Sequence, residues 1–264
     1  MRKLKFAVIG GGSTYTPELI EGLIDRKEQL NLDSLYLMDI NERKLNIVGG
    51  LIRRMLEKNQ MNTKLVLTQN LEEAIKDADY VVCQIRVGQL DARILDEKIP
   101  LKYDLLGQET TGAGGFMKAL RTIPVIMDIV KTIEKLAPEA WLINFTNPSG
   151  IIAEAVLNHS NVKMIGLCNA PYGMIKRAKE MLPEGTKEFD YDFVGLNHLC
   201  WITGLYADGK NIIQEKLKGD IEFAKLKNLT ETNRDDLLLR ATGGIPVGYL
   251  DYYYFRDKKI QECK

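Results

Sequence analysis

The stretch from Phe6 to Ile20, FAVIGGGSTYTPELI, constrains the fold of this 264-residue chain more than any other segment. A short apolar run ends in three glycines, and hydroxyl residues and Pro17 follow. Glycines permit positive φ angles and let backbone N–H groups approach a pyrophosphate closely, and proline suits the first turn of a helix. The order predicts a strand, a phosphate-binding turn and a helix. Tyr15 replaces the third glycine of the strict G-x-G-x-x-G pattern, so we expect looser helix–strand packing.

An acidic residue at the end of the second apolar run supports a dinucleotide site. Asp39 closes LYLMDI, and a carboxylate there can accept both ribose hydroxyls, which favours NAD over its 2′-phosphorylated form. The alternative is a tight structural turn and a helix-capping aspartate. Because strand, turn, helix and acid occur in order, we favour nucleotide binding. The candidate NAD-binding residues are Gly10, Gly11, Gly12, Ser13, Thr14 and Asp39.

Short apolar runs alternate with longer amphipathic segments along the first part of the chain. Near-continuous apolar runs are typical of parallel strands covered on both faces, so the alternation predicts an α/β fold with a doubly wound parallel sheet. Ligands bind such folds at the carboxyl ends of the strands. The predicted strands are Lys5–Gly10, Leu35–Met38, Lys64–Thr68, Tyr80–Ile85, Trp141–Phe145 and Met164–Leu167. The predicted helices are Pro17–Arg26, Glu42–Lys58, Leu71–Lys76, Phe116–Leu136, Ile151–Asn158 and Pro171–Met181.

The pattern changes after about Lys187. YDFVGLNHLCWITGLYADGK predicts a strand pair with its turn at Ala207–Gly209, and a polar helical stretch and a tyrosine-rich helix follow. We therefore predict a first, NAD-binding domain over 1–187 and, over 188–264, the beginning of a second domain with a partial α+β fold; the family resemblance described below implies that this is the substrate and dimerisation domain. Because the second region is short for a domain, we expect it to be incomplete or to depend on a partner.

Composition excludes several classes of protein. Lysine plus arginine equals aspartate plus glutamate at 36 each, which argues against a nucleic-acid binder. No run approaches the roughly 20 apolar residues of a membrane span, and the basic start is followed by too short an apolar run for a signal peptide. Four cysteines without C-x-x-C spacing favour reduced thiols in the cytoplasm. With two histidines, no mechanism can depend on a histidine cluster.

Two polar segments follow predicted strands and are candidates for substrate binding. Gln84–Gly115 is long and rich in glycine, and we expect a substrate loop in which Arg86 and Arg93 contact an anion. A solvated surface is the alternative for each arginine. Asn147 opens a helix in NFTNPSG and is either a helix cap or a donor to a sugar hydroxyl.

A cysteine and a histidine follow two further strands. Cys168 in GLCNAP precedes a helix, where we expect a depressed thiol pKa and therefore a better nucleophile or metal ligand. His198 lies in GLNHLCW. A buried structural histidine is the common alternative, and the spacing by itself is weak support for a metal. The pair does not make a closed zinc site, but an open site completed by substrate and water stays possible.

Taken together, these motifs resemble those of one known family over nearly the whole chain. VIGGGSTYTPEL, QIRVG, DEKIPLKY, GQETTGAGG, NFTNPSG, GLCNAP and GLNHL occur in the order seen in glycoside hydrolase family 4. These are NAD- and metal-dependent 6-phospho-glycosidases, an exception to the two-carboxylate scheme of glycoside hydrolysis. The resemblance implies a Rossmann-like fold. It also implies hydride removal from C3 of the sugar, loss of the C2 proton, elimination of the aglycone, water addition and reduction of C3.

The resemblance also implies roles for particular residues. Cys168 and His198 would be the two protein ligands of a divalent metal, usually Mn²⁺, although a thiolate on so hard an ion is unusual. Arg93 and Asn147 match the substrate contacts. Tyr249 resembles the base that takes the C2 proton. Without the resemblance, Tyr249 would be assigned to an aromatic core cluster with Tyr252 and Tyr253.

Two departures from the family's pattern bear on specificity. Family members that act on α-glycosides often have Asp directly after the metal cysteine, whereas this chain has Asn169, which resembles the β-glucosidase branch. Asp104 stands where the family generally has glycine. The first expectation is therefore hydrolysis of 6-phospho-β-glucosides to glucose 6-phosphate by a longer, homo-oligomeric chain. The alternatives are a 6-phospho-α-glucosidase or α-galactosidase, a 2-hydroxyacid dehydrogenase, and an inactive NAD-binding fragment.

Overall fold

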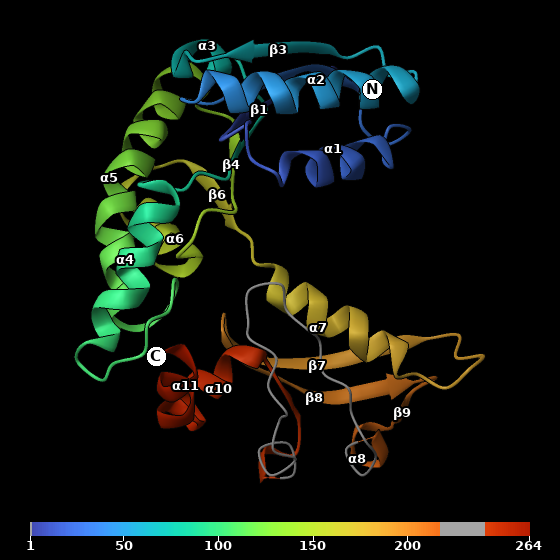
Figure 1. The fold of residues 1–264 in the computed structure, drawn as a ribbon. Coiled ribbons are helices and arrows are strands. Elements are labelled where there is room, and N and C mark those ends of the chain that lie inside the picture. Colours follow the sequence, from blue (N-terminus) through green and yellow to red (C-terminus); the bar gives the residue numbers. More distant parts are fainter. Residues whose placement is uncertain (1, 217–240) are drawn as a thin grey trace. The chain divides into compact units, whose positions relative to one another are not determined.

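The computed structural model describes residues 2–216 and 241–264, and the chain forms two compact units, Met1–Leu167 and Cys168–Lys264 (Figure 1). The helix that follows Cys168 lies in the second unit, whereas the sequence assigned it to the first domain. The boundary between 1–187 and 188–264 therefore stays a proposal. None of the described helices combines the length and the apolar character that a membrane-spanning helix needs.

The first unit is built on a six-stranded parallel sheet in the order β3-β2-β1-β4-β5-β6, which confirms the predicted α/β, Rossmann-like fold. Each predicted strand is present within one to three residues at its ends. The strands are β1 Leu4–Ile9, β2 Leu32–Met38, β3 Lys64–Thr68, β4 Tyr80–Cys83, β5 Trp141–Asn144 and β6 Lys163–Gly166. The helices are α1 Thr16–Ile24, α2 Glu42–Lys58, α3 Leu71–Ile75, α4 Gln89–Leu101, α5 Gly112–Leu136 and α6 Ser149–His159.

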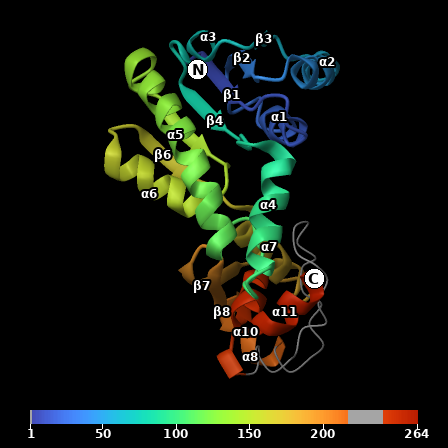
Figure 2. The same cartoon turned by 60° about the vertical axis from the view of Figure 1, so that its left-hand side comes forward.

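Helices cover both faces of this sheet, as a parallel sheet requires (Figure 2). Along β1, Phe6 and Val8 join the core beneath α1 and α2, whereas Ala7 and Ile9 join the core beneath α3, α5 and α6. The alternation follows the two-residue period of a strand. The near-continuous apolar runs in the sequence therefore reflect burial on two sides.

The segment Gln84–Gly115 differs from its prediction, because α4 occupies much of it. The sequence pattern did not predict this helix because apolar residues such as Leu90, Ile94 and Leu95 lie on its exposed side. Its buried residues include a charged one, Asp96, which forms a two-pronged ion pair with Arg121 of α5. A polar residue on the packed face removes the apolar periodicity by which an amphipathic helix is recognised.

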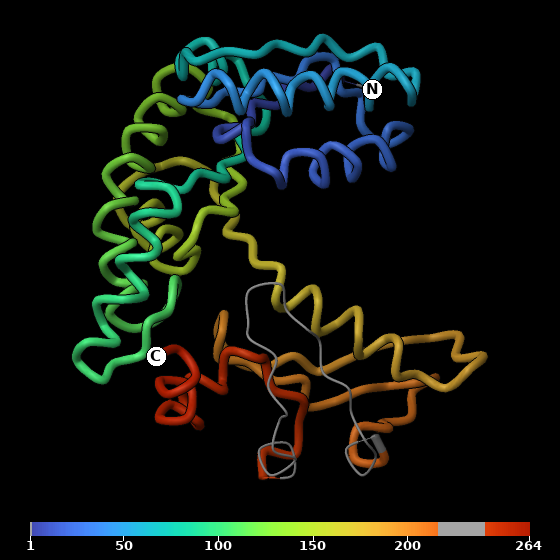
Figure 3. Tube along the Cα trace, in the orientation of Figure 1, coloured from blue at the N-terminus to red at the C-terminus, as the bar shows by residue number. Residues whose placement is uncertain are grey.

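The second unit contains an antiparallel sheet in the order β10-β8-β7, with β9 paired to β8. The orange trace in Figure 3 follows β7 and β8 running antiparallel. The turn that the sequence predicts at Ala207–Gly209 is present, but the sequence did not predict a second turn, between β7 and β8. The predicted turn joins β8 only to the short β9, while β7 and β8 meet at Asn197-His198. The elements are α7 Asn169–Glu180, β7 Phe189–Leu196, β8 Leu199–Ala207, β9 Lys210–Asn211, α8 Ile213–Lys216, β10 Ile245–Pro246, η1 Gly248–Leu250, α10 Asp251–Tyr254 and α11 Arg256–Cys263.

Candidate functional site

The glycine turn lies between β1 and α1, as its sequence predicts, and the backbone there leaves no room for side chains. Gly10 has φ +89°, and a Cβ on it would lie 2.7 Å from the carbonyl oxygen of Gln84. A Cβ on Gly11 would lie 2.8 Å from the Cβ of Leu37. The amides of Gly10 and Gly11 both donate to the carbonyl of Met38, at 2.9 and 2.8 Å. The turn is therefore clamped against β2 and against the end of β4.

Asp39 holds the third glycine of this turn. Its Oδ2 accepts from the Gly12 amide at 2.9 Å, and its Oδ1 accepts from the Asn41 amide at 2.8 Å. The helix cap suggested as an alternative belongs instead to Asn41, whose side chain accepts from the Lys44 amide. Each carboxylate oxygen has a second lone pair, so these bonds leave acceptor capacity for two hydroxyls.

Hydroxyl groups after the glycines are used unequally. Ser13 Oγ accepts from the Tyr15 amide at 3.2 Å, and Thr14 is exposed. Buried Thr16 donates to the Gly11 carbonyl at 3.0 Å and accepts at 2.7 Å from Gln84, which also donates to the Gly10 carbonyl. Gln84 therefore ties the end of β4 to the glycine turn. The sequence did not single it out, because a lone glutamine after a strand carries no distinctive motif.

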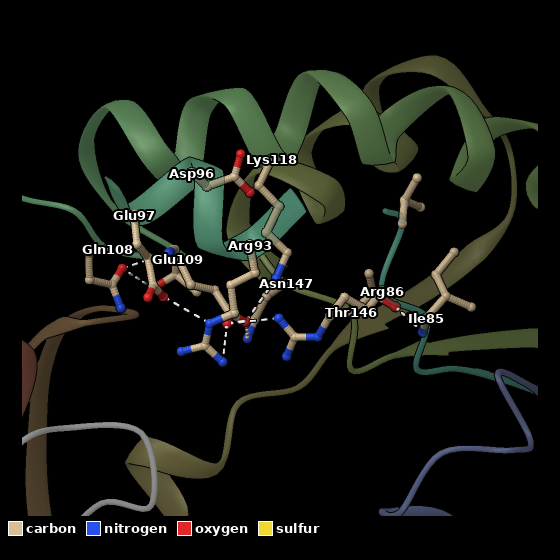
Figure 4. A network of polar contacts seen from close by, with 12 residues as sticks. Ile85, Arg86, Arg93, Asp96, Glu97, Gln108, Glu109, Lys118, Thr146 and Asn147 are labelled. Atoms are coloured by element: carbon tan, nitrogen blue, oxygen red, sulfur yellow. Dashed lines mark hydrogen bonds and ion pairs between the residues drawn. The ribbon is translucent and has the colours of Figure 1, made fainter. Parts of the chain in front are cut away.

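A second polar cluster surrounds Glu109, which is 6% exposed in the segment between α4 and α5. Four side chains point at its carboxylate (Figure 4). Its Oε2 accepts from Arg86 at 2.9 Å and from Arg93 at 2.8 Å. Its Oε1 accepts from Lys118 at 2.8 Å and from Asn147 at 3.3 Å. We call these five residues the Glu109 cluster, and the four donors match the roughly four lone-pair positions of a carboxylate.

The charges of this cluster keep Glu109 ionised. Burial opposes the charge, but Lys118 and Arg86 outweigh burial and lower the pKa of Glu109 to about 2. Arg93 also donates from Nε to Glu97 at 2.8 Å. Three cations thus meet two carboxylates, and one positive charge remains in excess.

Glycine and threonine residues shape the backbone around this cluster. A Cβ on Gly107 would lie 1.9 Å from the carbonyl oxygen of Glu97, so only glycine allows the segment before Glu109 to pass so close to α4. The Oγ1 of Thr146 accepts from the Ile85 amide at 2.9 Å and joins the ends of β4 and β5. Asn147 follows directly. It does not cap α6, whose N-cap is Pro148, and it donates to Glu109 instead.

In the second unit, Cys168 and His198 come together. Their Sγ and Nε2 atoms are 3.4 Å apart. Cys168 is the N-cap of α7, and His198 lies in the two-residue turn between β7 and β8. His198 has φ +64°, a backbone conformation that non-glycine residues seldom adopt and that is frequent at functional sites.

Burial keeps both groups neutral. It raises the pKa of the Cys168 thiol, although the Ala170 amide and the Asn197 side chain act in the opposite direction. The depressed thiol pKa expected from the sequence is therefore wrong for this structure, because desolvation outweighs the helix N-terminus. Burial also lowers the pKa of His198 to about 4, so the imidazole is neutral near pH 7. Asn197, another residue that the sequence did not single out, lies beside His198 in the turn.

Tyr249 stacks face to face on His198. The ring centroids are 3.5 Å apart and the planes differ by 5°. Tyr249 is 7% exposed in η1, and its ring also makes a T-shaped contact with Tyr252, with the ring centroids 6.0 Å apart. Tyr253 is 53% exposed, so the aromatic core suggested as an alternative does not include it. Asn169 is exposed at the first position of α7.

The residues present fit both a dinucleotide and a divalent metal. The glycine turn packs too tightly for any Cβ, and it lies at the start of α1, where phosphate groups bind in folds of this kind. A thiol and a neutral imidazole at 3.4 Å can ligate one ion. Within residues 2–216 and 241–264, no third His, Cys, Asp or Glu completes a metal-binding group. Among the described residues, Cys168 and His198 are therefore the two candidate metal ligands.

Comparison with known proteins connects these features. The family model described as "Family 4 glycosyl hydrolase" matches residues 5–184, and the model of that family's C-terminal domain matches 193–264. The chain is 46% identical, over 98% of its length and 60% of the relative's, to a probable 6-phospho-β-glucosidase of Bacillus subtilis. It is 45% identical, over 98% of its length and 59% of the relative's, to the 6-phospho-β-glucosidase of Escherichia coli.

A solved structure shows the same likeness. The 6-phospho-β-glucosidase of Thermotoga maritima, determined with manganese, NAD⁺ and glucose 6-phosphate, superposes with a TM-score of 0.87 at 37% identity, over 98% of this chain and 62% of the other. The chain thus spans about three fifths of the length of these relatives. By the family models, by the ordered motifs and by the fold, the chain belongs to glycosyl hydrolase family 4.

Proposed function

We propose that this chain carries the cofactor-binding and metal-binding parts of a 6-phospho-β-glucosidase that uses NAD and a divalent metal, with Mn²⁺ as the first choice. One observation supports the proposal above all others. Cys168, His198 and Tyr249 converge in the second unit, with 3.4 Å between thiol and imidazole and a stacked phenol. A dehydrogenase of 2-hydroxyacids has no use for the thiol.

Each group of residues has a separate task in the proposed reaction. Bound NAD⁺ would oxidise C3 of the sugar, and the bound metal would polarise the oxygens at C2 and C3. The turn Gly10–Gly12 lets the pyrophosphate approach the start of α1, Ser13 and Thr14 offer hydroxyl groups to it, and Asp39 accepts hydroxyls of the ribose. Cys168 and His198 hold the metal. Arg93 and Asn147 orient sugar hydroxyls.

Tyr249 is the proposed base. A ketone at C3 makes the C2 hydrogen acidic, and the phenol oxygen of Tyr249 would take that proton. The electron pair left at C2 expels the aglycone from C1 as a double bond forms. Water then adds to C1, a proton returns to C2, and reduction at C3 completes the cycle without net oxidation.

Asn169 favours the β-glucoside over the α-glucoside. A carboxamide next to Cys168 cannot donate a carboxylic proton to the leaving group, whereas family members that act on α-glycosides often have Asp at this position. The 6-phospho-β-glucosidase of Escherichia coli, at 45% identity, supports the same choice. A 6-phospho-α-glucosidase is the second candidate.

The test is hydrolysis of p-nitrophenyl β-glucoside 6-phosphate with NAD⁺ and Mn²⁺, omitting each in turn. We expect p-nitrophenol only with both present, no accumulation of NADH, and deuterium at C2 of the glucose 6-phosphate formed in D₂O. Stoichiometric NADH would favour the dehydrogenase. Product without deuterium at C2 would contradict the redox–elimination route. Because relatives are longer, the assay is run on this chain and on a chain of their length.

We further propose that the active protein is a cytoplasmic homo-oligomer. Exposed apolar side chains on α4 and α5, including Leu90, Ile94, Phe116 and Leu120, support the assembly because such surfaces are common at interfaces. Sedimentation of a chain of the relatives' length is expected to give a dimer or larger, and a monomer at micromolar concentration would contradict this.

A further inference from the structure

A buried lysine with no assigned role lies at the base of the Glu109 cluster. Lys118, in the second turn of α5, is 2% exposed, and its ammonium donates to Glu109 Oε1 at 2.8 Å. Lysines are seldom buried to this degree without a specific partner. Because desolvating the ammonium costs free energy, we expect its charge to have a function in the Glu109 cluster.

The geometry shows what the charge does. Lys118 and Asn147 share Oε1, whereas Arg86 and Arg93 share Oε2. With Lys118 present, the carboxylate is fixed at both oxygens, so Arg93 and Asn147 are held from two sides of one rigid group. Without it, the Asn147 carboxamide at 3.3 Å would be the partner left on Oε1 in this cluster.

The charges support the same reading. Burial and the two neighbouring arginines lower the pKa of Lys118, while Glu109 raises it. Glu109 receives three cations and has its pKa lowered to about 2, whereas Lys118 shares this one carboxylate with Arg86 and Arg93. The surroundings of Lys118 therefore disfavour its own charged form, while its charge stabilises the ionised form of Glu109.

We propose that Lys118 is a positioning residue that, through Glu109, fixes the Arg93 guanidinium and the Asn147 carboxamide in the orientation that binds sugar hydroxyls. The binding role of Arg93 and Asn147 rests on the proposed function, but their dependence on Lys118 does not. The rival interpretation is that the lysine stem merely fills space in the packing of α5.

The first experiment detects changes in the environment of the Arg93 and Asn147 side chains in the absence of sugar. Side-chain NMR signals of Arg93 and Asn147 are compared between wild type, Lys118→Met and a control, Lys131→Met. Lys131 lies on the same helix but is exposed and pairs with Asp128 at 3.3 Å. We expect the signals to shift only in Lys118→Met. Unchanged Arg93 and Asn147 signals in that variant would overturn the proposal.

The same samples give the protonation of Glu109. The groups facing it are Arg86 after β4, Arg93 on α4 with its partner Glu97, Lys118 on α5 and Asn147 after β5. Removing one adjacent cation is expected to raise the midpoint of the Glu109 carboxyl signal by about one pH unit or more from its wild-type value near 2. An equal midpoint of the Glu109 signal in Lys118→Met and wild type would show that Lys118 contributes only packing and not charge.

The second experiment measures binding of glucose 6-phosphate by calorimetry with NAD⁺ and Mn²⁺ present. Lys118→Met is expected to weaken binding roughly tenfold or more, the scale of losing one hydrogen bond to a charged group. Lys118→Arg is expected to restore most of it, because charge and donors return. Equal affinity in wild type and Lys118→Met would overturn the proposal and leave the proposed function intact.

Two further outcomes can be distinguished from a failure of the proposal on Lys118. If the wild type binds no glucose 6-phosphate, the proposed function fails, and the NMR comparison still decides the role of Lys118. If circular dichroism shows that Lys118→Met does not fold, Glu109→Asp replaces it. Its shorter carboxylate cannot reach all four donors, so the Arg93 and Asn147 signals must shift, and unshifted signals would count against the proposal.

Discussion

In the first unit the Glu109 cluster holds a buried carboxylate ionised by three neighbouring cations, whereas in the second unit Cys168 and His198 are both held neutral. The cause is the balance between burial and neighbouring charge. Glu109 has three cations around it and keeps its charge despite burial. For Cys168 and His198, burial is the leading cause of both pKa shifts, and it disfavours the charged form of each group.

The comparison predicts whether a substitution should lower stability or should lower binding and catalysis. Removing one member of a buried ionic cluster leaves another charge unpaired, so the cost appears as lost stability. Replacing a neutral thiol or phenol by a group of similar shape leaves no uncompensated charge, so the cost appears as lost binding or catalysis. The predictions below test this division, beginning with the largest expected effect.

Tyr249→Phe is expected to lower kcat by roughly 10²–10⁴, the range for losing a general base. The phenyl ring keeps its stacking on His198, so thermal stability and the affinities for NAD⁺ and Mn²⁺ should change little. Steady-state kinetics on a chain of the relatives' length measure the effect. Tyr252→Phe, which alters the edge-on neighbour, is the control. A fully active Tyr249→Phe enzyme would place the base elsewhere.

Cys168→Ser is expected to weaken Mn²⁺ binding by more than the roughly 10–100-fold that loss of an outer-shell partner costs. Electron paramagnetic resonance of bound Mn²⁺ measures it, and NAD⁺ binding by calorimetry should stay near the wild-type value. Cys263→Ser, at an exposed cysteine, is the matched control. Equal Mn²⁺ uptake by both variants would remove Cys168 from the ligand set.

Glu109→Gln is expected to lower the free energy of unfolding by about 3 kcal/mol, because Lys118 then lies buried without a negative partner. Urea denaturation measures the loss. Asp128→Asn breaks the exposed pair with Lys131 by the same chemical change, and should cost about 0–1 kcal/mol. If the two variants lose equal stability, the charges of the Glu109 cluster do not stabilise the fold.

The smallest expected effect is a difference in the pH at which each unit loses stability, measured with EDTA present. His198 has its pKa lowered from 6.5 to about 4, so its unfolded form binds more protons and stability falls as pH drops from 6.5 to 4. Glu109 has its pKa lowered from 4.5 to about 2, so its contribution is lost as pH falls from 4.5 to 2.

The two tryptophans allow each unit to be followed by fluorescence, because Trp141 lies in β5 and Trp201 in β8. Trp201→Phe reports the first unit and Trp141→Phe the second. We expect the second unit to weaken at the higher pH. Identical pH profiles from the two variants would show that the units do not differ in this way.

The sequence predicted well wherever local chemistry dictates structure. Three glycines after an apolar strand require a tight turn whatever surrounds it, and near-continuous apolar runs require burial on two faces. The ordered motifs were enough to identify the family. The sequence failed at α4, whose packed face carries Asp96, and at the β7–β8 turn, where His198 adopts a backbone conformation that residue type rarely indicates.

Only the tertiary structure determines which charged and polar side chains contact one another. Glu109 lies between α4 and α5, Lys118 lies on α5 and Asn147 follows β5, so no spacing in the chain pairs them. Cys168 was expected to have a depressed thiol pKa from its place before a helix, yet burial reverses the direction. Local pattern fixes backbone geometry because its forces act between neighbours, whereas desolvation and ion pairing depend on which distant segments pack around a group.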